Sequence, residues 1–469
     1  MGSLQPSLDG LCPATMAPLR YNSSDADGAC MSTLCGSSDQ VLGLLAESSY
    51  HLWTLARNDN TGLYLDHYDV LHPDYANQTW GQAAIGSTGL GLVAETIALA
   101  MGWLDLSTYQ QRVLLTMQTL AGLTPNVQVA RNVNGWMPTF VDSNTGHASD
   151  PDRFSTLATG LNTAGVLFVQ TYLNNTGRTD PNSLRIAALA QQLFRQVKWT
   201  AFLCTSNGSV DPDGSAIPML LNANNTLGSA LSPLEGDGLY PFFEMHYTVW
   251  LLYHSVCGAL SPPECTAHPR IAQLWLRWQG RRLQPNHAYQ GHPLLSIWAA
   301  YLVQLPYYVT HSFNSDTSYN SLFHSHWQAD WAYYNSSRYN AGGQGQYGLG
   351  AGPTQQWCAG TGYESDNLQP DSATAQHCRT YSPYSVVGYI PTQPDVIVRH
   401  VLALAATGET SLLLPRDLGV VLWRKSLVNS SWVQGYGVTM VDFAAELFGL
   451  STLWLGEAFF QNHTNHFSN

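Results

Sequence analysis

The chain has 469 residues, of which only 19 are Lys or Arg and 32 are Asp or Glu, so its formal net charge is −13. A protein with so few cations has no electrostatic means of holding a phosphate backbone, which excludes nucleic acid as a partner. Hydrophobic residues make up 45% of the sequence, which excludes intrinsic disorder and allows a large buried core.

Apolar residues recur mostly with helical periodicity, and strand-like alternation is scarce. In chain order, the pattern predicts helices near 39–57, 88–103, 107–122, 155–174, 183–199, 242–257, 268–281, 292–304, 321–334, 394–406, 411–425 and 440–450. Twelve helices joined by alternately short and long loops predict six helical hairpins and hence an all-α fold, the (α/α)6 barrel. The connections 124–154, 200–241 and 335–392 are unusually long, and such loops generally form the walls of a site.

The domain organisation follows from this pattern. We expect residues 1–38 to form a disulfide-tethered N-terminal arm and residues 39–469 to form one catalytic domain with long rim loops. Residues 83–104 are apolar enough to imitate a membrane span, but several glycines and Glu95 in mid-segment would be unfavourable in a bilayer. We therefore expect a buried core helix there, with Glu95 as a satisfied helix residue, and no membrane partner.

Cysteines and sequons indicate the compartment. The eight cysteines match no zinc-binding pattern, and they are Cys12, Cys30, Cys35, Cys204, Cys257, Cys265, Cys358 and Cys378. Eight Asn-x-Ser/Thr sequons begin at Asn22, Asn77, Asn174, Asn207, Asn224, Asn335, Asn429 and Asn462. Together with the scarcity of lysine, these features favour an oxidising, extracellular eukaryotic setting and predict a secreted glycoprotein.

A short, turn-rich span separates Cys257 from Cys265 and can close a disulfide loop. We expect Cys358 to pair with Cys378. By elimination, the remaining four cysteines would then pair among themselves and tie the N-terminal arm to the 200–241 loop.

Two carboxylates lie inside strongly apolar, aromatic helix segments. Glu244 lies in residues 240–250 and Asp442 in residues 436–445, each near a helix start. An apolar wall raises the pKa of a carboxyl group, which can then act as a general acid, while a second, ionised carboxylate can activate water; glycosidic bonds are cut in this way. The alternative is that each residue only caps its helix, since acidic residues favour first turns.

Other motifs support no cofactor. Residues 343–348 formally satisfy the Gly-x-Gly-x-x-Gly pattern, but no predicted strand precedes them, so a loop is the better interpretation. His324 and His326 could chelate a metal, but no carboxylate lies at helical ligand spacing, so ordinary polar contacts are expected. We therefore expect neither a metal nor an organic cofactor.

Aromatic residues crowd 327–334 and recur through the loop 335–392, among polar side chains. Because pyranose rings have apolar faces and polar edges, this combination is typical of a carbohydrate groove. The candidate substrate-binding residues are His246, Trp331, Tyr347, Glu364, Tyr384 and Tyr436.

Eight segments together resemble, in the same order, the glycoamylase-like proteins and, within them, the endo-β-1,2-glucanases of glycoside hydrolase family 162. The segments are 52–63 (LWTLARNDNTGL), 84–94 (AIGSTGLGLVA), 131–136 (RNVNGW), 155–168 (STLATGLNTAGVLF), 241–246 (PFFEMH), 347–351 (YGLGA), 384–391 (YSVVGYIP) and 435–442 (GYGVTMVD). The likeness spans roughly residues 40–460, nearly the whole chain.

The resemblance implies an (α/α)6 barrel that cleaves β-1,2-glucan internally, with inversion, and releases sophorooligosaccharides. It implies that Glu244 is the general acid and Asp442 the general base, with the proton of the attacking water passed to the base through a substrate hydroxyl. The expected partner is a β-glucan, and we expect the protein to be a monomer. Segments 347–353 and 155–159 each lack an acidic residue of the clan pattern, which leaves another β-glucan linkage or transglycosylation open.

Two further classes of function stay open. A polysaccharide lyase on the same barrel would need cations to bind a polyanion, and seventeen arginines on a chain of charge −13 argue against it. A catalytically silent sugar-binding protein would bind oligosaccharide and release no reducing ends. The segments around Glu244 and Asp442 are intact, which ranks this class last.

Independence from metals is directly testable. Hydrolysis of β-1,2-glucan, measured as released reducing ends, should persist after exhaustive dialysis against EDTA, because the sequence contains no cluster of ligands for a catalytic ion. Activity that disappears and is restored by one particular divalent cation would contradict this expectation.

Overall fold

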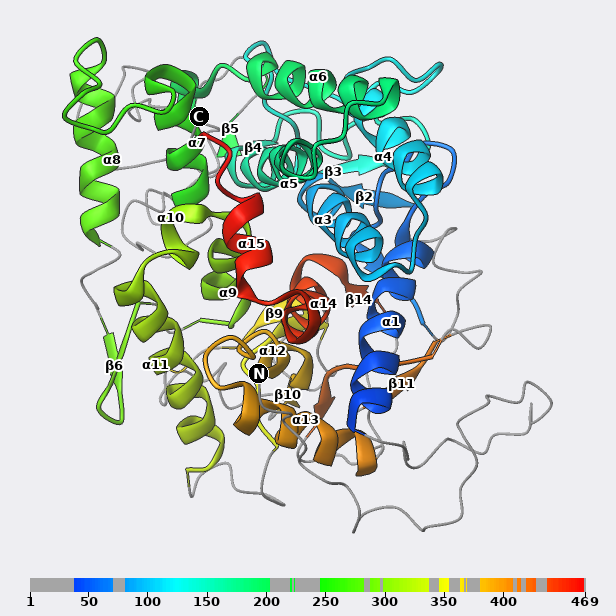
Figure 1. Ribbon diagram of the computed structural model, residues 1–469, viewed down its shortest axis with the longest axis vertical. Coiled ribbons are helices and arrows are strands. Elements are labelled where there is room, and N and C mark those ends of the chain that lie inside the picture. The colour runs from blue at the N-terminus through cyan, green and yellow to red at the C-terminus, as the bar shows by residue number, and fades with distance from the viewer. Residues whose placement is uncertain are drawn as a thin grey trace.

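The computed structural model describes residues 38–70, 81–202, 220–221, 223, 245–281, 287–295, 298–336, 346–353, 363–366, 368, 380–407, 411–414, 419–426 and 437–467. Helices dominate these residues (Figure 1). The longer helices are α1 (Ser38–Ala56), α3 (Ile85–Met101), α4 (Leu106–Leu120), α5 (Thr156–Asn175), α6 (Pro181–Gln196), α7 (Met245–Cys257), α8 (Pro269–Arg281), α9 (Tyr301–Val309), α11 (Thr317–Tyr334), α13 (Pro394–Thr407) and α14 (Met440–Leu455). The shorter ones are η1 (Trp199–Phe202), α10 (His311–Asn314), α12 (Pro383–Val387) and α15 (Glu457–His463).

The strands are short and pair as separate antiparallel two-stranded sheets. The pairs are β1 (His67–Tyr68) with β14 (Val438–Thr439), β2 (Gln82–Ala84) with β3 (Phe140–Asp142), β4 (Phe154–Ser155) with β5 (Leu220–Leu221), β6 (His287–Tyr289) with β7 (His292–Leu294), β8 (Ala351–Pro353) with β9 (Tyr363–Ser365), β10 (Thr380–Tyr381) with β13 (Lys425–Ser426) and β11 (Ser411–Leu413) with β12 (Val420–Leu422). They connect or flank the helices and build no continuous sheet.

Most of the predicted helices are present, and the local signals explain their starts. The Asp105 side chain accepts a hydrogen bond from the Thr108 amide and caps α4, and Asp180 caps α6 in the same way through Ser183. For the helix predicted over 242–257, the structure describes residues from 245 onward. The proposed N-terminal arm lies almost entirely outside the described residues.

One predicted helix, 411–425, is wrong, and another, 292–304, is helical only from Tyr301 onward. Residues 292–294 are the second strand of the β6–β7 hairpin, whose turn residues Gln290 and Gly291 both have positive φ, and the helix begins only at Tyr301. Residues 411–413 and 420–422 pair as β11 and β12, because β-branched Val420 and Val421 favour a strand. Gly419 has φ +114°, and a Cβ atom there would lie 1.9 Å from the Ser48 hydroxyl, so the chain needs glycine at this turn.

The helix in residues 83–104 is a core helix, as predicted. Residues 85–98 of α3 are buried, and its closest neighbour is α5: a Cβ atom at Gly165 would lie 2.0 Å from the Gly89 carbonyl oxygen. Among the described residues, no single helix is long and apolar enough to cross a membrane; only α14 and α15 taken together reach that length, and they meet at a 107° bend.

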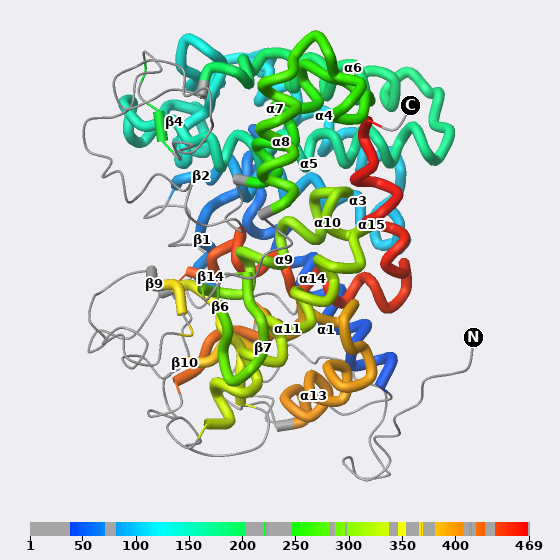
Figure 2. The backbone as a smooth tube through the Cα atoms, turned by 90° about the vertical axis from the view of Figure 1, so that its left-hand side faces the viewer, coloured from blue at the N-terminus to red at the C-terminus, as the bar shows by residue number. Residues whose placement is uncertain are grey.

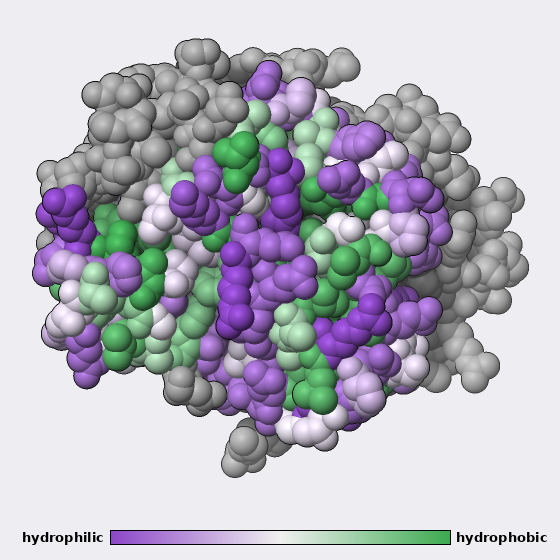
Figure 3. Space-filling view, turned by 90° about the horizontal axis from the view of Figure 1, so that it is seen from above, coloured by the Kyte–Doolittle hydropathy of each residue, from purple (hydrophilic) through white to green (hydrophobic). Residues whose placement is uncertain are grey.

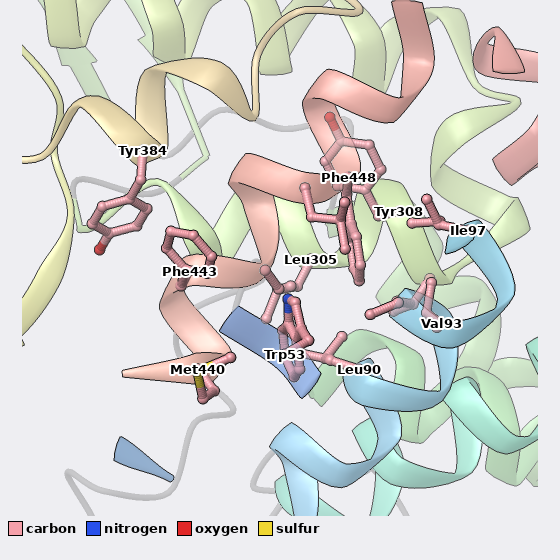
Figure 4. Packing of buried hydrophobic residues seen from close by; sticks show 14 of the residues in the cluster. Trp53, Leu90, Val93, Ile97, Leu305, Tyr308, Tyr384, Met440, Phe443 and Phe448 are labelled. Carbon is pink, nitrogen blue, oxygen red and sulfur yellow. The ribbon is translucent and has the colours of Figure 1, made fainter. Parts of the chain in front are cut away.

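The main core surrounds α14, which lies in the middle of the molecule with α1, α3 and α12 around it (Figure 1). Figure 4 shows side chains of α14 packed with those of α1, α3, α9 and α12; the labelled residues are Trp53, Leu90, Val93, Ile97, Leu305, Tyr308, Tyr384, Met440, Phe443 and Phe448. The buried side chains of α14 therefore connect these helices in one core.

The end of the molecule near α6 mixes hydrophilic and hydrophobic residues at its surface (Figure 3).

Glu95 is a buried carboxylate with partners from three segments. It accepts hydrogen bonds of 2.8 Å from the hydroxyls of Tyr50 and Tyr64, and Arg112 of α4 lies 3.3 Å away. The expectation of a satisfied helix residue is confirmed, and the partners come from segments that the sequence does not place nearby. Glu95 thus ties α1 and α4 to α3.

The disulfide predicted between Cys257 and Cys265 is confirmed. Their Cα atoms are 5.4 Å apart, and the bond closes the turn between α7 and α8. The other six cysteines lie outside the described residues.

The Glu95 cluster yields a stability prediction. Glu95→Gln should lower the free energy of unfolding by about 2 kcal/mol, because hydrogen bonds to a buried charged group are each worth about 1.5–3 kcal/mol and Arg112 loses its partner. Glu47→Gln is the matched control, because Glu47 is half exposed and only faces His51 at 3.9 Å. Thermal unfolding of both variants measures the effect; equal melting temperatures would contradict it.

Candidate active site

The pairing of β1 with β14 brings residues from opposite ends of the sequence together. His67 lies opposite Thr439 and Tyr68 opposite Val438, and the Met440 amide donates a 2.9 Å hydrogen bond to the Asp66 carbonyl. Strand β14 contacts β8, the partner of β9, and Figure 2 shows β1, β14 and β9 toward the left-hand side of the molecule. The start of α14 is therefore attached to the Asp66–His67 segment.

Asp442 lies in the first turn of α14 and is only 1% exposed. Among the described residues, its charge raises the pKa of two groups from other elements, His67 of β1 and Tyr384 of α12. The amide ends of the helix favour negative charge at this position. Asp442 and Tyr384, both predicted as site residues, are therefore brought together.

His67 contacts one carboxylate, that of Asp66, and feels the charge of a second, that of Asp442. Its Nδ1 atom contacts the Asp66 carboxylate, and both side chains are largely buried. Burial disfavours the imidazolium, but the hydrogen bond and charge of Asp66, followed by the charge of Asp442, outweigh it and raise the pKa of His67. A cation is therefore favoured beside Asp442.

Tyr384 is buried and joins α12 to β8. Its hydroxyl accepts a hydrogen bond from the Ala351 amide and donates one to the Ala351 carbonyl, both of 2.8 Å. Its ring stacks on Trp423 at 4.8 Å. Burial, and then the charge of Asp442, raise the pKa of its phenol. Tyr384 therefore fixes the backbone of residue 351.

Two carboxylates hold the backbone of the segment 347–351. Asp330 accepts a 3.0 Å hydrogen bond from the Leu349 amide, and Asp366 accepts one of 3.0 Å from the Gly350 amide. Glycine is required at 350, because a Cβ atom there would lie 2.4 Å from the Ser382 side chain and 2.6 Å from the Tyr384 hydroxyl oxygen. Segment 347–351, one of the segments that carry the family resemblance, therefore forms a stretch of backbone, called the wall below, that hydrogen bonds to Asp330, Asp366 and Tyr384 hold in place.

Arg424 is a fully buried cation behind this wall. Its guanidinium lies 3.2 Å from the Asp366 carboxylate and donates a 3.1 Å hydrogen bond to the Ser382 hydroxyl. Although burial opposes the charge, the pairing with Asp366 raises its pKa. This ion pair therefore bridges the residue after β9 and the segment after β12.

Asp330, which lies on α11, has no such cation among the residues that the structure describes. Burial raises its pKa to about 8, although the backbone amides of Leu349 and Gly348 partly oppose the shift. At neutral pH Asp330 is therefore mainly protonated, and it serves the wall as a neutral hydrogen-bonding group.

The other predicted sugar-binding residues are placed differently. Tyr347 is buried, accepts a 2.9 Å hydrogen bond from the Trp327 indole and packs on His400 at 4.5 Å. Trp331 is 50% exposed on α11. His246 is 0% exposed, with its Nε2 atom 3.1 Å from the Trp278 carbonyl oxygen, so it packs in the core between α7 and α8 and has no surface to offer a sugar.

Three predicted residues cannot be placed in full. Glu244 and Tyr436 lie outside the described residues, although α7 begins at Met245, the next residue after Glu244. Glu364 lies in β9 opposite Gly352, and its side chain is outside the described part. Their roles stay predictions.

The histidines proposed for polar contacts do not form a metal site in the described part of the chain. His326 is buried with its Nδ1 atom 2.6 Å from the Tyr389 hydroxyl, and burial lowers its pKa to about 4. Within the described ranges, no group of three or more His, Cys, Asp or Glu side chains could hold a metal ion. Most of the Gly-x-Gly-x-x-Gly segment 343–348 lies outside those ranges.

Two further charged residues, Asp330 and Arg424, can be recognised from the sequence. Asp330 lies in the aromatic run 327–334 and Arg424 in the apolar run 420–424, so both satisfy the criterion that selected Glu244 and Asp442: a charge in an apolar segment. Asp66 and His67 carry no such signal, because only the β1–β14 pairing brings them to Asp442.

Comparison with known proteins gives likeness in structure alone. No model of a protein family matches the chain, and no curated protein matches its sequence. The endo-β-1,2-glucanase from Chitinophaga pinensis, solved with sophorotriose and glucose, matches with a TM-score of 0.68 and 14% identity over 91% of this chain and 95% of that one. The endo-β-1,2-glucanase from Talaromyces funiculosus, solved with sophorose, matches with a TM-score of 0.63 and 13% identity over 91% of this chain and 87% of that one.

Two further matches extend this picture. A variant of the Talaromyces enzyme with Gln in place of one Glu was solved with β-1,2-glucan. A glucoamylase candidate from Bacteroides caccae matches with a TM-score of 0.66 and 16% identity over 90% of this chain and 96% of that one. The chain therefore shares its helical fold with endo-β-1,2-glucanases over nearly its whole length.

The raised pKa of Asp330 predicts a pH dependence of stability. Between the unfolded pKa near 4 and the folded pKa of about 8, the folded state holds a proton that the unfolded state has lost, so rising pH destabilises the fold. Asp330→Asn keeps the acceptor for Leu349 and removes this dependence, so its melting temperature should gain on that of the wild type from pH 5 to pH 8.

The exposed loop variant Asp152→Asn is the control and should follow the wild type across the same range. If Asp330→Asn also runs parallel to the wild type at every pH, the buried carboxyl group does not titrate as described.

Proposed function

We propose that the protein is a glycoside hydrolase that cleaves β-1,2-glucan internally, with Glu244 as general acid and Asp442 as general base. The observation that carries the proposal is the likeness of fold to endo-β-1,2-glucanases over about nine tenths of the chain. We further propose that the helices complete an (α/α)6 barrel and that the protein acts as an extracellular monomer. The Cys257–Cys265 disulfide is consistent with an oxidising compartment.

The surroundings of Asp442 suit a base. A general base must be ionised, and Asp442 has His67 and the amide end of α14 on its side. It is too buried to be an ordinary surface carboxylate. This supports its role over that of a simple helix cap.

The proposed reaction is a single displacement. Glu244 donates a proton to the glycosidic oxygen as the bond to the anomeric carbon breaks, and water attacks that carbon from the opposite face. The proton of the water passes through a substrate hydroxyl to Asp442. The Talaromyces variant with Gln in place of Glu, solved with β-1,2-glucan, is consistent with a glutamate in the acid role.

The substrate residues follow from exposure. Trp331, half exposed on α11, is available to stack on a sugar ring, and Glu364 and Tyr436 are proposed to contact the glucan. Tyr347 and Tyr384 are proposed to act through the wall 347–351 that they support. His246 is buried against Trp278, so a role in the site would be indirect, through the packing of α7.

Substitution of the two carboxylates tests the proposal. Glu244→Gln and Asp442→Asn keep size and most hydrogen bonding but remove proton transfer, which is worth roughly 100- to 10,000-fold in rate. Each variant should bind sophorooligosaccharides and lose at least that much turnover, while Glu47→Gln, on the exposed side of α1, keeps its activity. A lower melting temperature with little change in turnover would instead favour the helix-cap interpretation.

The anomer of the first product tests the stereochemistry. Single displacement at a β-linkage inverts the anomeric carbon, so proton NMR in the first minutes should show the α-anomer. An initial β-anomer would mean a covalent intermediate and would remove Asp442 from the role of base. A product with ultraviolet absorbance from a new double bond would favour a lyase.

A further inference from the structure

We propose that His67, oriented by Asp66, is a positioning residue that holds Asp442 as a carboxylate ready to accept a proton. The inference rests on the proposed function, because it assigns a role to the neighbours of the proposed base. It adds two residues from the N-terminal part of the chain to a site whose other proposed residues, from Glu244 onward, lie in the second half of the chain.

The backbone fixes His67 at the start of α14. The His67 and Thr439 Cα atoms are partners in the β1–β14 ladder, and the Met440 amide donates to the Asp66 carbonyl at 2.9 Å. Gly437, with φ +83°, packs on the imidazole so closely that a Cβ atom there would lie 3.1 Å from Cδ2 of His67. The ring therefore has little freedom to turn away from its position.

The charges of Asp66 and Asp442 both favour a positive charge on His67. Asp66 contacts Nδ1 of His67, which fixes the ring orientation and favours the imidazolium. The imidazolium and Asp442 attract each other, because the charge of Asp442 also raises the pKa of His67. In the described part of the chain, the charged and titratable groups near His67 include Asp66 beside the ring, Asp442 on α14, Tyr384 on α12 and the Arg424–Asp366 pair beyond Tyr384. The buried Tyr68 and Asp69 follow His67 directly in the chain.

Other buried carboxyl groups of the same protein show why Asp442 needs a cation. Glu446 lies about one helical turn after Asp442 on α14. It is buried without a cation among the described residues, and burial raises its pKa to about 8. Asp330 behaves in the same way. Glu95 and Asp366, by contrast, each have an arginine partner. His67 supplies the positive charge that Asp442 requires to remain ionised at the pH of catalysis.

The consequence for catalysis is a shift of the acidic limb of the pH profile. An opposite charge within about 4–6 Å typically lowers the pKa of a carboxyl group by one to three units. Removal of His67 should therefore raise the midpoint of the acidic limb of kcat by roughly one pH unit or more. The alkaline limb, which reports the acid Glu244, should stay in place, and KM should change little.

The experiment compares wild type, His67→Gln, Asp66→Asn and His51→Gln in kcat and KM against pH on β-1,2-glucan. His51→Gln is the matched control, because it removes a histidine that faces a carboxylate, Glu47 at 3.9 Å, on the surface of α1. The acidic limb should shift most in His67→Gln, less in Asp66→Asn and not at all in His51→Gln. A uniform loss of kcat without a shift would mean that His67 only supports the fold, and would overturn the proposal.

A second readout does not depend on activity. In protein labelled with 13C at histidine Cε1, the resonance that is missing from His67→Gln identifies His67, and Asp442→Asn should lower the pKa of that resonance. If wild type does not cleave β-1,2-glucan but this coupling is present, the proposed function fails and the ion pair stands. If wild type is active but the His67 titration is unchanged in Asp442→Asn, the present inference fails.

Discussion

The structure depends on the antiparallel pairing of β1 with β14, which joins the start of the helical domain to its last long helix. This ladder attaches the Asp66–His67 segment to the first turn of α14 and so defines the surroundings of Asp442. The same closure is strengthened where the Ser49 hydroxyl donates a 3.0 Å hydrogen bond to Glu446. A site that is assembled across the chain in this way forms only when the whole helical domain has folded.

Buried carboxyl groups in the described part of the chain differ in whether a cation lies beside them. Arg112 lies beside Glu95 and Arg424 beside Asp366, and the charge of Asp442 raises the pKa of His67. For Asp330 and Glu446, burial instead raises the pKa of the carboxyl group to about 8. Breaking such a pair would leave an uncompensated charge in a medium that solvates it poorly. Among the described residues, buried carboxyl groups whose pKa rises to about 8 support the backbone, and other buried carboxyl groups lie beside cations. A carboxyl group that holds its proton at neutral pH cannot accept one there.

Sequence periodicity predicted most of the helices, because apolar stripes such as that of α6 depend on local order along the chain. It failed at 411–425, where Val420 and Val421 belong to a hairpin fixed by contact of Gly419 with Ser48, and at 292–300, where a tight turn precedes the helix. Asp442 was predictable as a charge in an apolar segment. His67 was not, because its role comes from a long-range strand pairing that leaves no local pattern.

The central claim is hydrolysis of β-1,2-linkages, and a panel of polysaccharides tests it most directly. Purified protein would be incubated with linear β-1,2-glucan, laminarin and carboxymethylcellulose, and the products measured as reducing ends and by chain length. We expect a rapid fall in the chain length of β-1,2-glucan alone, with sophorooligosaccharides as products. Intact β-1,2-glucan together with cleavage of laminarin or carboxymethylcellulose would contradict it.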